Sequence, residues 1–470
     1  MTPNINTNQS EHTEVCEKKP SQGLQYRVNP DRKTCEIAGI GSCGDNAIII
    51  PAVIDGYTVT GIGAEAFRGC TNLIAVNIPD SVTEIKDGAF RGCTGLLATK
   101  IPSFTKIIGN LAFSGCVKLL WLAIPASVVF IGKAAFAGIG EVRVQETNRN
   151  YRSADRHLYS GDGKTLLHYA ANTKASTFTV PDGVTAIDDY AFFNCLHLTD
   201  VTIGDSVKSI GESAFRLCKR LQTAVIGNSV TSLGEEAFLG CENLVSVSIG
   251  SAVTEIPKDA FAFCMKLKEA TIPDSVKTIG DRAFVNCESL TAVLFGKSVA
   301  GIGRGAFGRC GRLTDVRYAG AYDEWEKIAF ASDWKKGSAI REINLLASSG
   351  GLGISHGLEY RLCEDGKTCE IAGIGICKDS TVVIPEMIDN YRVTGIGAEA
   401  FAASSVTGAV LLESITKLGD RAFNGCKNLS VFCYAGTKKQ WNKISLGKKW
   451  RSASAIRRVE CIDKAIKFLF

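Results

Sequence analysis

The sequence predicts a repeat solenoid, a fold in which short units of similar sequence stack on one another. Three observations support this fold class: the dipeptide Ala-Phe stands in one repeat position twelve times, mostly at intervals of 23 residues; cysteine stands three residues after the phenylalanine in ten of these copies; and a constant pattern of apolar residues precedes each copy. The phenylalanines are Phe67, Phe90, Phe113, Phe136, Phe192, Phe215, Phe238, Phe261, Phe284, Phe307, Phe401 and Phe423. A unit of this length cannot bury its apolar side alone, so the copies are expected to stack.

Residues 73–95 show one unit, LIAVNIPDSVTEIKDGAFRGCTG. Val and Ile alternate in its first six residues, which predicts a short strand with alternate side chains buried. Pro79 ends that strand, because proline donates no ladder hydrogen bond. The V-x-x-I step begins the return path, and the glycine that follows it in most units is expected to permit a tight bend. A-F-x-x-C-x-x-L then has roughly helical apolar spacing. We therefore predict a leucine-rich-repeat solenoid of about 23-residue units, with a parallel β ladder on one face and short helical or irregular return segments.

Two pairs of copied segments predict where the array begins and ends. Residues 24–67 and 358–401 align at an offset of 334, and their alternating apolar residues between turn signals predict β-rich N-terminal caps. Two closing segments share tryptophans: Trp325 and Trp334 match Trp441 and Trp450. We predict a disordered leader over residues 1–23, which lacks the apolar run of a signal peptide. A first module over 24–345 has about ten repeats, a Gly/Ser linker covers 346–357, and a second module over 358–470 has about two repeats.

An insertion interrupts the first module. The distance from Phe136 to Phe192 is 33 residues more than one period, and Gly161-Asp162-Gly163 lies between two apolar runs. This pattern predicts a hairpin insertion over about 141–178. The insertion holds His157 and His168, which we interpret as a surface pair without function rather than a functional pair across the hairpin.

The chain has 18 cysteines, and their spacing argues against a disulfide framework. Ten of them occupy one repeat position: Cys70, Cys93, Cys116, Cys195, Cys218, Cys241, Cys264, Cys287, Cys310 and Cys426. Stacked turns lie about 4.8 Å apart, whereas a disulfide prefers Cβ atoms about 3.8 Å apart. We therefore expect a ladder of buried free thiols. Zinc is not expected, because no C-x₂-C pair is present.

Several strings resemble active-site motifs without their context. The G-x-G-x-x-A strings at 61–66, 301–306 and 395–400 resemble a dinucleotide loop, but they are the repeat's own I-G-x-x-A-F. Gly163-Lys164-Thr165 and Gly366-Lys367-Thr368 lack the first glycine of a phosphate loop. Cys363 has no counterpart in the first cap, and we interpret it as an idle thiol. We predict no catalytic residue, no cofactor site, no metal site and no enzymatic activity.

Charge gives little evidence about partners. The net charge of +5 does not favour nucleic acid, and no apolar run is long enough to span a membrane. Residues 427–470 hold 11 Lys and Arg against two acids. This basic tail either contacts an anionic surface or is a solvated capping helix, and we favour the second.

The unit L-x-x-V-x-I-P-x-S-V-x-x-I-G-x-x-A-F-x-x-C resembles the BspA-like leucine-rich-repeat family of bacterial and protist surface proteins. The resemblance extends from residue 24 to about 461. It implies a non-enzymatic protein-binding scaffold at the cell surface, with adhesion to host or matrix macromolecules. The missing signal peptide supports the alternative of an intracellular scaffold for protein–protein interactions.

Binding is expected on the outward strand positions, which form a continuous face in a solenoid. Trp121 is the largest side chain predicted there, and Leu97 and Leu120 lie near it. An exposed apolar patch of this kind is typical of an interaction hot spot. In the alternative, the insertion folds back and covers Trp121.

Overall fold

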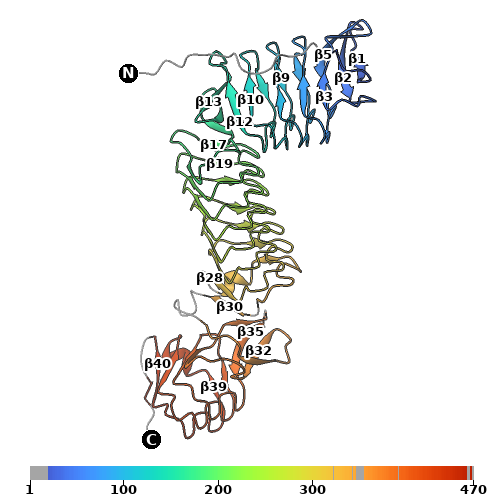
Figure 1. Cartoon of the computed structure of the whole chain (residues 1–470). Coiled ribbons are helices and arrows are strands. Elements are labelled where there is room, and N and C mark those ends of the chain that lie inside the picture. Colours follow the sequence, from blue (N-terminus) through green and yellow to red (C-terminus); the bar gives the residue numbers. More distant parts are fainter. Residues whose placement is uncertain are drawn as a thin grey trace. The chain divides into compact units, whose positions relative to one another are not determined.

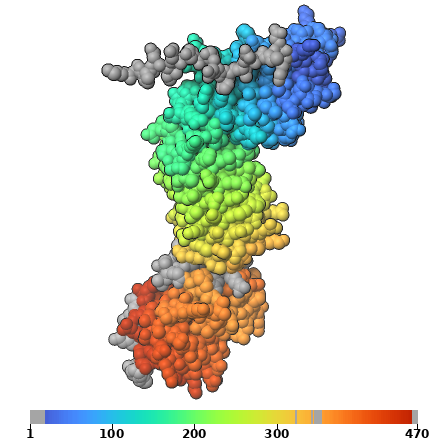
Figure 2. Space-filling view, viewed as in Figure 1, coloured from blue at the N-terminus to red at the C-terminus, as the bar shows by residue number. Residues whose placement is uncertain are grey.

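The computed structural model describes residues 19–320, 322–340, 342–345, 354–389, 391–462 and 466–467. Most of the predicted leader (1–18) and of the predicted linker (346–353) lies outside the described residues. Contacts divide the chain into two compact units: unit 1 runs to residue 173 and takes in 188–195, and unit 2 holds 174–187 and the residues from 196 onward. Each unit is a β-solenoid of short strands (Figure 1), which confirms the predicted fold class. Within each unit the surface changes colour in successive bands (Figure 2), because each turn packs against its sequence neighbours.

Unit 1 has two parallel ladders, one on each side of its core. The face strands are β3 (Ala47–Ile49), β6 (Ala75–Asn77), β8 (Ala98–Thr99), β10 (Trp121–Ile124) and β12 (Glu141–Val144). They form the parallel sheets β3-β6-β8 and β10-β12. The return strands are β7 (Glu84–Ile85), β9 (Ile107–Ile108) and β11 (Phe130–Ile131), which continue in parallel from β5 (Tyr57–Ile62) of the cap.

A cap and a meander complete unit 1. The cap adds β1 (Gln25–Val28), β2 (Thr34–Gly39) and the two-residue strand β4 (Val53–Ile54), which pairs antiparallel with β5. The meander consists of β13 (Tyr151–Ala154), β14 (His157–Ser160) and β15 (Thr165–His168), paired antiparallel in that order. The turn at Gly161–Gly163 joins β14 to β15.

Unit 2 repeats the two-ladder arrangement. Its face strands are β16 (Thr177–Thr179), β18 (Asp200–Ile203), β20 (Thr223–Ile226), β22 (Ser246–Ser248), β24 (Glu269–Ile272), β26 (Ala292–Phe295), β28 (Asp315–Tyr318) and β30 (Glu342–Leu345). Its return strands are β17 (Ala186–Ile187), β19 (Ser209–Ile210), β21 (Ser232–Leu233), β23 (Glu255–Ile256), β25 (Thr278–Ile279), β27 (Gly301–Ile302) and β29 (Ala329–Phe330).

The second cap and the last repeats also belong to unit 2. The cap holds β31 (Glu359–Leu362), β32 (Thr368–Gly373), β33 (Thr381–Val383), β34 (Met387–Ile388) and β35 (Tyr391–Ile396). After it come β36 (Gly408–Leu411), β37 (Lys417–Leu418), β38 (Val431–Tyr434), β39 (Ser445–Leu446), β40 (Arg458–Cys461) and β41 (Ile466–Lys467). Helices α1 (Tyr322–Trp325) and α3 (Lys438–Trp441) lie in the two closing segments, and the return segments between caps are irregular turns and short strands. The expectation of a capping helix over the basic tail is wrong for its described residues, because they form short strands and turns around the four-residue α3.

Ladders of identical side chains fill the core. In unit 2, Phe215, Phe238 and Phe261 stack with ring centroids 4.9 and 5.3 Å apart, and the phenylalanines of unit 1 stack in the same way. The cysteine ladder lies beside them. Seven of its thiols donate a hydrogen bond, at 2.9–3.4 Å, to the backbone oxygen of the phenylalanine one repeat earlier. Cysteine therefore suits this position because it is small, apolar and a weak donor.

The repeat glycines have a different role from the one predicted. Gly109 N donates to Ile85 O of the preceding turn at 2.8 Å, and a Cβ on Gly109 would lie 2.5 Å from Asp87 N. The glycine is needed because two turns approach closely there, rather than for a bend with positive φ.

Candidate functional site

An exposed column of apolar side chains runs along the face strands of unit 1. Ile74, Leu97 and Leu120 stand in the same position of three successive repeats, just before β6, β8 and β10, and all three are exposed. Leu97 N donates to Ile74 O at 2.8 Å, so these residues lie on adjacent turns. Trp121, the first residue of β10, is 50% exposed beside Leu120. We call these four residues the Trp121 face. Sequence reasoning named three of them and missed Ile74, although it lies one period before Leu97.

The insertion does not cover Trp121. Instead it contributes Arg143 of β12, which pairs in parallel with β10 so that Ala123 faces Arg143 and Trp121 faces Glu141. The Arg143 guanidinium carbon lies 5.1 Å from the centroid of the indole ring. A cation at this distance is attracted by the ring quadrupole and restricts the indole's rotamers. Trp121 is therefore held in place while one side stays open to solvent.

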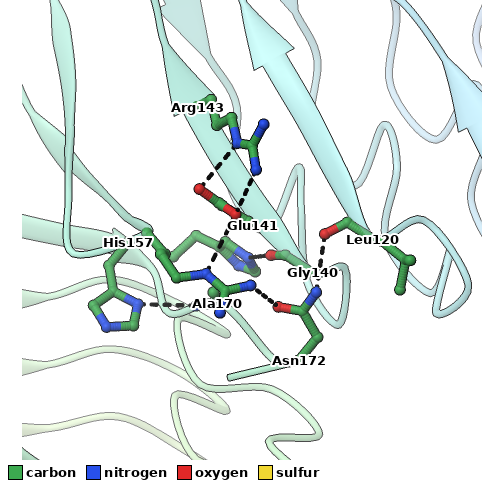
Figure 3. Close-up of polar contacts among 9 residues, drawn as sticks. Leu120, Gly140, Glu141, Arg143, His157, Ala170 and Asn172 are labelled. Atoms are coloured by element: carbon green, nitrogen blue, oxygen red, sulfur yellow. Dashed lines mark hydrogen bonds and ion pairs between the residues drawn. The ribbon is translucent and has the colours of Figure 1, made fainter. Parts of the chain in front are cut away.

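A polar network fixes Arg143 and the strand that carries it (Figure 3). Arg143 donates to both carboxylate oxygens of Glu141, at 3.0 and 3.1 Å, and this pairing is the main reason that the pKa of Glu141 is lowered. Arg156 Nε lies 3.3 Å from the same carboxylate and Arg156 Nη2 donates to Asn172 Oδ1 at 3.2 Å. Asn172 Nδ2 donates in turn to Leu120 O at 3.0 Å. The network therefore joins the meander to Leu120 of the Trp121 face.

The interpretation of His157 and His168 as surface residues is wrong, because both are buried. Ala170 N donates to His157 Nδ1 at 3.1 Å, and His168 Nε2 lies 2.8 Å from Gly140 O (Figure 3). The His157 ring also stacks on Tyr169, with centroids 4.3 Å apart. Burial lowers the pKa of each imidazole to about 4, so both are neutral at pH 7. They anchor the meander next to the Trp121 face.

A second exposed apolar cluster lies on the return side of unit 1 and was missed from sequence. It consists of Phe104, Ile107, Val129 and Phe130, all exposed. Ile107 and Phe130 are directly paired in β9 and β11, in the ladder position that Glu84 holds in β7. Comparing this position between repeats would have found the cluster, because it holds glutamate at 84, isoleucine at 107 and phenylalanine at 130.

The remaining sequence candidates show no arrangement for chemistry. Two of the strings that resemble a dinucleotide loop lie in the return ladders, where Gly61 pairs with Glu84 and Gly301 pairs with Thr278. Gly163, from a string that resembles a phosphate loop, lies in the turn between β14 and β15. Within the described parts of the chain, no group of three or more His, Cys, Asp or Glu side chains could hold a metal ion. Where the structure describes helices, none is long and apolar enough to cross a membrane. Cys363 is half-buried, and no disulfide joins it to another cysteine that the structure describes.

Of three similar solved structures, the first supports the fold. A leucine-rich repeat protein from Eubacterium ventriosum matches at 24% identity with a TM-score of 0.55, covering 68% of this chain and 94% of that one. A leucine rich cell surface protein from Faecalibacterium prausnitzii matches at 25% identity with a TM-score of 0.44, covering 67% and 98%. A leucine-rich repeat protein from Bacteroides ovatus matches at 21% identity with a TM-score of 0.43, covering 94% and 98%. No curated protein matches the chain.

The family model of the BspA type leucine rich repeat region matches residues 49–162, 168–291, 254–345 and 381–444. These ranges cover well over half of the chain and include both the Phe and the Cys ladders. The chain therefore belongs to the BspA-type leucine-rich-repeat family.

Proposed function

We propose that this protein is a non-enzymatic scaffold that binds another protein through the Trp121 face. One observation carries the proposal: an apolar column over three repeats ends at a large aromatic side chain that is half exposed and held in place by Arg143. Isolated apolar side chains are common on protein surfaces, whereas contiguous ones mark interaction sites.

The composition of the face suits a protein partner. Tryptophan and arginine are enriched among residues that contribute most to binding, and Leu97 and Leu120 would exclude water around them. Arg143 and Glu141 form a polar rim beside the ring. Because the network from Arg156 to Asn172 already orders this rim, binding would cost little side-chain entropy.

Membership of the family supports the finer proposal of a surface protein that adheres to host or matrix macromolecules. One observation favours an intracellular scaffold instead: no disulfide joins the cysteines that the structure describes, a state typical of reducing compartments. Thiol counting on natively purified protein, denatured without reductant, separates the two. Titration of all 18 thiols supports the intracellular form, and a lower number would indicate disulfides and an oxidising compartment.

A photocrosslinking experiment tests where a partner binds. Benzoylphenylalanine is placed at Leu97 and, as a matched control, at Lys268, which holds the same repeat position in unit 2. Both variants are exposed to purified extracellular matrix proteins and to lysate of the producing cell. We expect crosslinks to a defined partner from position 97 and none from position 268. Equal crosslinking from both positions would remove the support for the Trp121 face.

A further inference from the structure

Within unit 2, the first array of repeats is joined to the second cap by a strand pair. Strand β30, which ends the first array, pairs antiparallel with β34 of the cap, with Ile343 opposite Met387 and Glu342 opposite Ile388. The other edge of β30 pairs with β28 of its own array. A single sheet therefore runs from the face strands through β30 and β34 into the cap.

Side chains on both sides of this joint are buried or share a cavity. Met387 is 5% exposed and Ile388 is buried with it. Phe330 and Trp334 of the closing segment line one cavity together with Met387 and Tyr391 of the cap. Burial lowers the pKa of Lys335 in the closing segment, and the negative charge of Asp389 in the cap opposes this shift, so charges of opposite sign lie on the two sides of the joint.

Among the residues that the structure describes, no strand covers the same surface on the first cap. Val53 and Ile54 of β4 are the counterparts of Met387 and Ile388 at the offset of 334. In the described chain β4 pairs with β5 alone, and Val53 is 55% exposed where its counterpart Met387 is 5% exposed. The rest of the cap is built alike: Asp55 accepts a hydrogen bond from Tyr26 at 2.7 Å, as Asp389 does from Tyr360 at 2.9 Å.

The second closing segment carries the complementary surface. Strand β40 is the counterpart of β30 at an offset of 116, and its inner edge pairs with β38 as β30 pairs with β28. The outer edge of β40 corresponds to the edge of β30 that pairs with β34 of the cap. In β40 this edge pairs with β41, with Val459 opposite Ile466. Leu446 stands in place of Phe330 and is exposed.

Charge also favours this match. Arg451 is the counterpart of Lys335, and Asp55 is the counterpart of Asp389, so the pair of opposite charges across the internal joint has an equivalent between the two ends of the chain. Residues 427–470 are strongly basic, and the first cap, residues 24–67, has three basic residues against five acidic ones. Opposite charges on two surfaces favour their encounter.

We propose that two copies of this chain join head to tail, with β4 of one copy pairing with β40 of the other after β41 leaves that edge. The internal joint between β30 and β34 is the template for this contact. Strand β41 then acts as a plug that covers an exposed sheet edge until a second copy replaces it. Because the contact uses two different surfaces, it can propagate into longer chains of molecules.

Sedimentation velocity over about a hundredfold range of protein concentration tests the plug. Ile466→Pro removes a backbone donor from β41 and should tighten self-association at least about tenfold relative to the unaltered chain. A chain that ends at Cys461 lacks β41 and should self-associate as tightly as the Ile466→Pro variant. If both variants stay folded by circular dichroism and sediment like the unaltered chain at every concentration, the proposal is wrong.

A mixing experiment tests the polarity of the joint. In the Ile466→Pro background, Val53→Asp blocks the cap surface and Leu446→Asp blocks the closing surface. Each double variant alone should be monomeric, whereas an equimolar mixture should form dimers that grow no further, since one joint remains. A mixture that stays monomeric, or Val53→Asp that still associates, overturns the proposal.

A matched control uses the same cap. Val28 is exposed, and its counterpart Leu362 stays 47% exposed in the internal joint, so this position is not covered when the joint forms. Val28→Asp in the Ile466→Pro background should therefore associate as strongly as Ile466→Pro alone. A loss equal to that of Val53→Asp would mean that any added charge on the cap abolishes association, and the assignment of β4 would fail.

Discussion

The two units have the same core and different surfaces. The column just before the face strands is apolar and exposed in unit 1, as Ile74, Leu97 and Leu120 show. In unit 2 the same column is mostly polar: Thr199, Gln222, Val245, Lys268, Thr291 and Thr314. On the return side, Ile107 and Phe130 of unit 1 contrast with serines at 209 and 232 in unit 2. Inward positions are constrained by stacking, whereas outward positions are free to differ, so an outward difference is informative about function.

The largest expected effect tests the shared core. Phe113→Ala in unit 1 and Phe238→Ala in unit 2 each remove a ring stacked between two others. Each substitution should cost about 3–5 kcal/mol of unfolding free energy, because a large cavity forms in a tightly packed ladder. Urea unfolding followed by circular dichroism measures this loss. A cost under about 1 kcal/mol in one unit alone would show that the cores are not equivalent.

The next effect distinguishes the units by pH. His157 and His168 of unit 1 have folded pKa values of about 4, against about 6.5 in an unfolded chain. Above about pH 6.5 the two histidines are unprotonated in both the folded and the unfolded chain. Between about pH 6.5 and pH 4 they bind protons in the unfolded chain and stay unprotonated in the folded one. Unit 1 should therefore lose stability as pH falls through this window, by up to about 1.4 kcal/mol per pH unit for each histidine. Burial raises the pKa of Asp188, which offsets part of the loss near its lower end.

Urea unfolding at pH 7 and pH 5 with pulsed hydrogen exchange measures this difference for each unit. The described histidines of unit 2, His197 and His356, are exposed, so the loss is expected in unit 1. In the variant His157→Asn with His168→Gln, amide groups replace the ring hydrogen bonds and the pH dependence should flatten. An unchanged slope in that variant would assign the acid sensitivity to other groups.

A smaller effect tests the thiol ladder. Cys116→Ala in unit 1 and Cys264→Ala in unit 2 each remove a donor to a phenylalanine carbonyl, Phe90 O and Phe238 O. We expect a loss of about 1 kcal/mol in each case, since that carbonyl also accepts a backbone hydrogen bond from the cysteine three residues after it. Thermal unfolding measures the loss, and a stabilising effect in either unit would contradict a structural role for the thiol.

The smallest stability effect is expected at Trp121. Its ring is 50% exposed and has a single cationic contact, so Trp121→Ala should cost about 1 kcal/mol or less. Thermal unfolding beside Val225→Ala, a matched exposed apolar residue of unit 2, measures this. A loss several times larger would show that Trp121 belongs to the core and would weaken the contrast between the units.

Sequence reasoning predicted what depends on the repeat and missed what depends on contacts outside it. The Phe and Cys positions identify the core because the same residue recurs in each repeat, which indicates that each copy is buried in the same way. The burial of His157 and His168 follows from packing of the meander against Gly140 and Tyr169, which no periodicity reveals. The exposure of Trp121 was left open for the same reason. Ile74 and Phe130 could have been found by comparing outward columns between repeats.

The pairing of β30 with β34 was also beyond sequence reasoning, because a linker composition says nothing about which strand edges meet. The predicted boundary between the two modules at residues 346–357 stays a prediction. The same holds for the basic tail and an anionic surface, and for the absence of a nucleic-acid partner.

The most direct test of the central claim is the affinity of the crosslinked partner for three proteins: the unaltered chain, Trp121→Ala and Val225→Ala. Surface plasmon resonance should give at least about tenfold weaker binding for Trp121→Ala, equivalent to about 1.4 kcal/mol, and unchanged binding for Val225→Ala. The thermal midpoint of Trp121→Ala should stay nearly unchanged. Equal affinities for all three proteins would contradict binding through the Trp121 face.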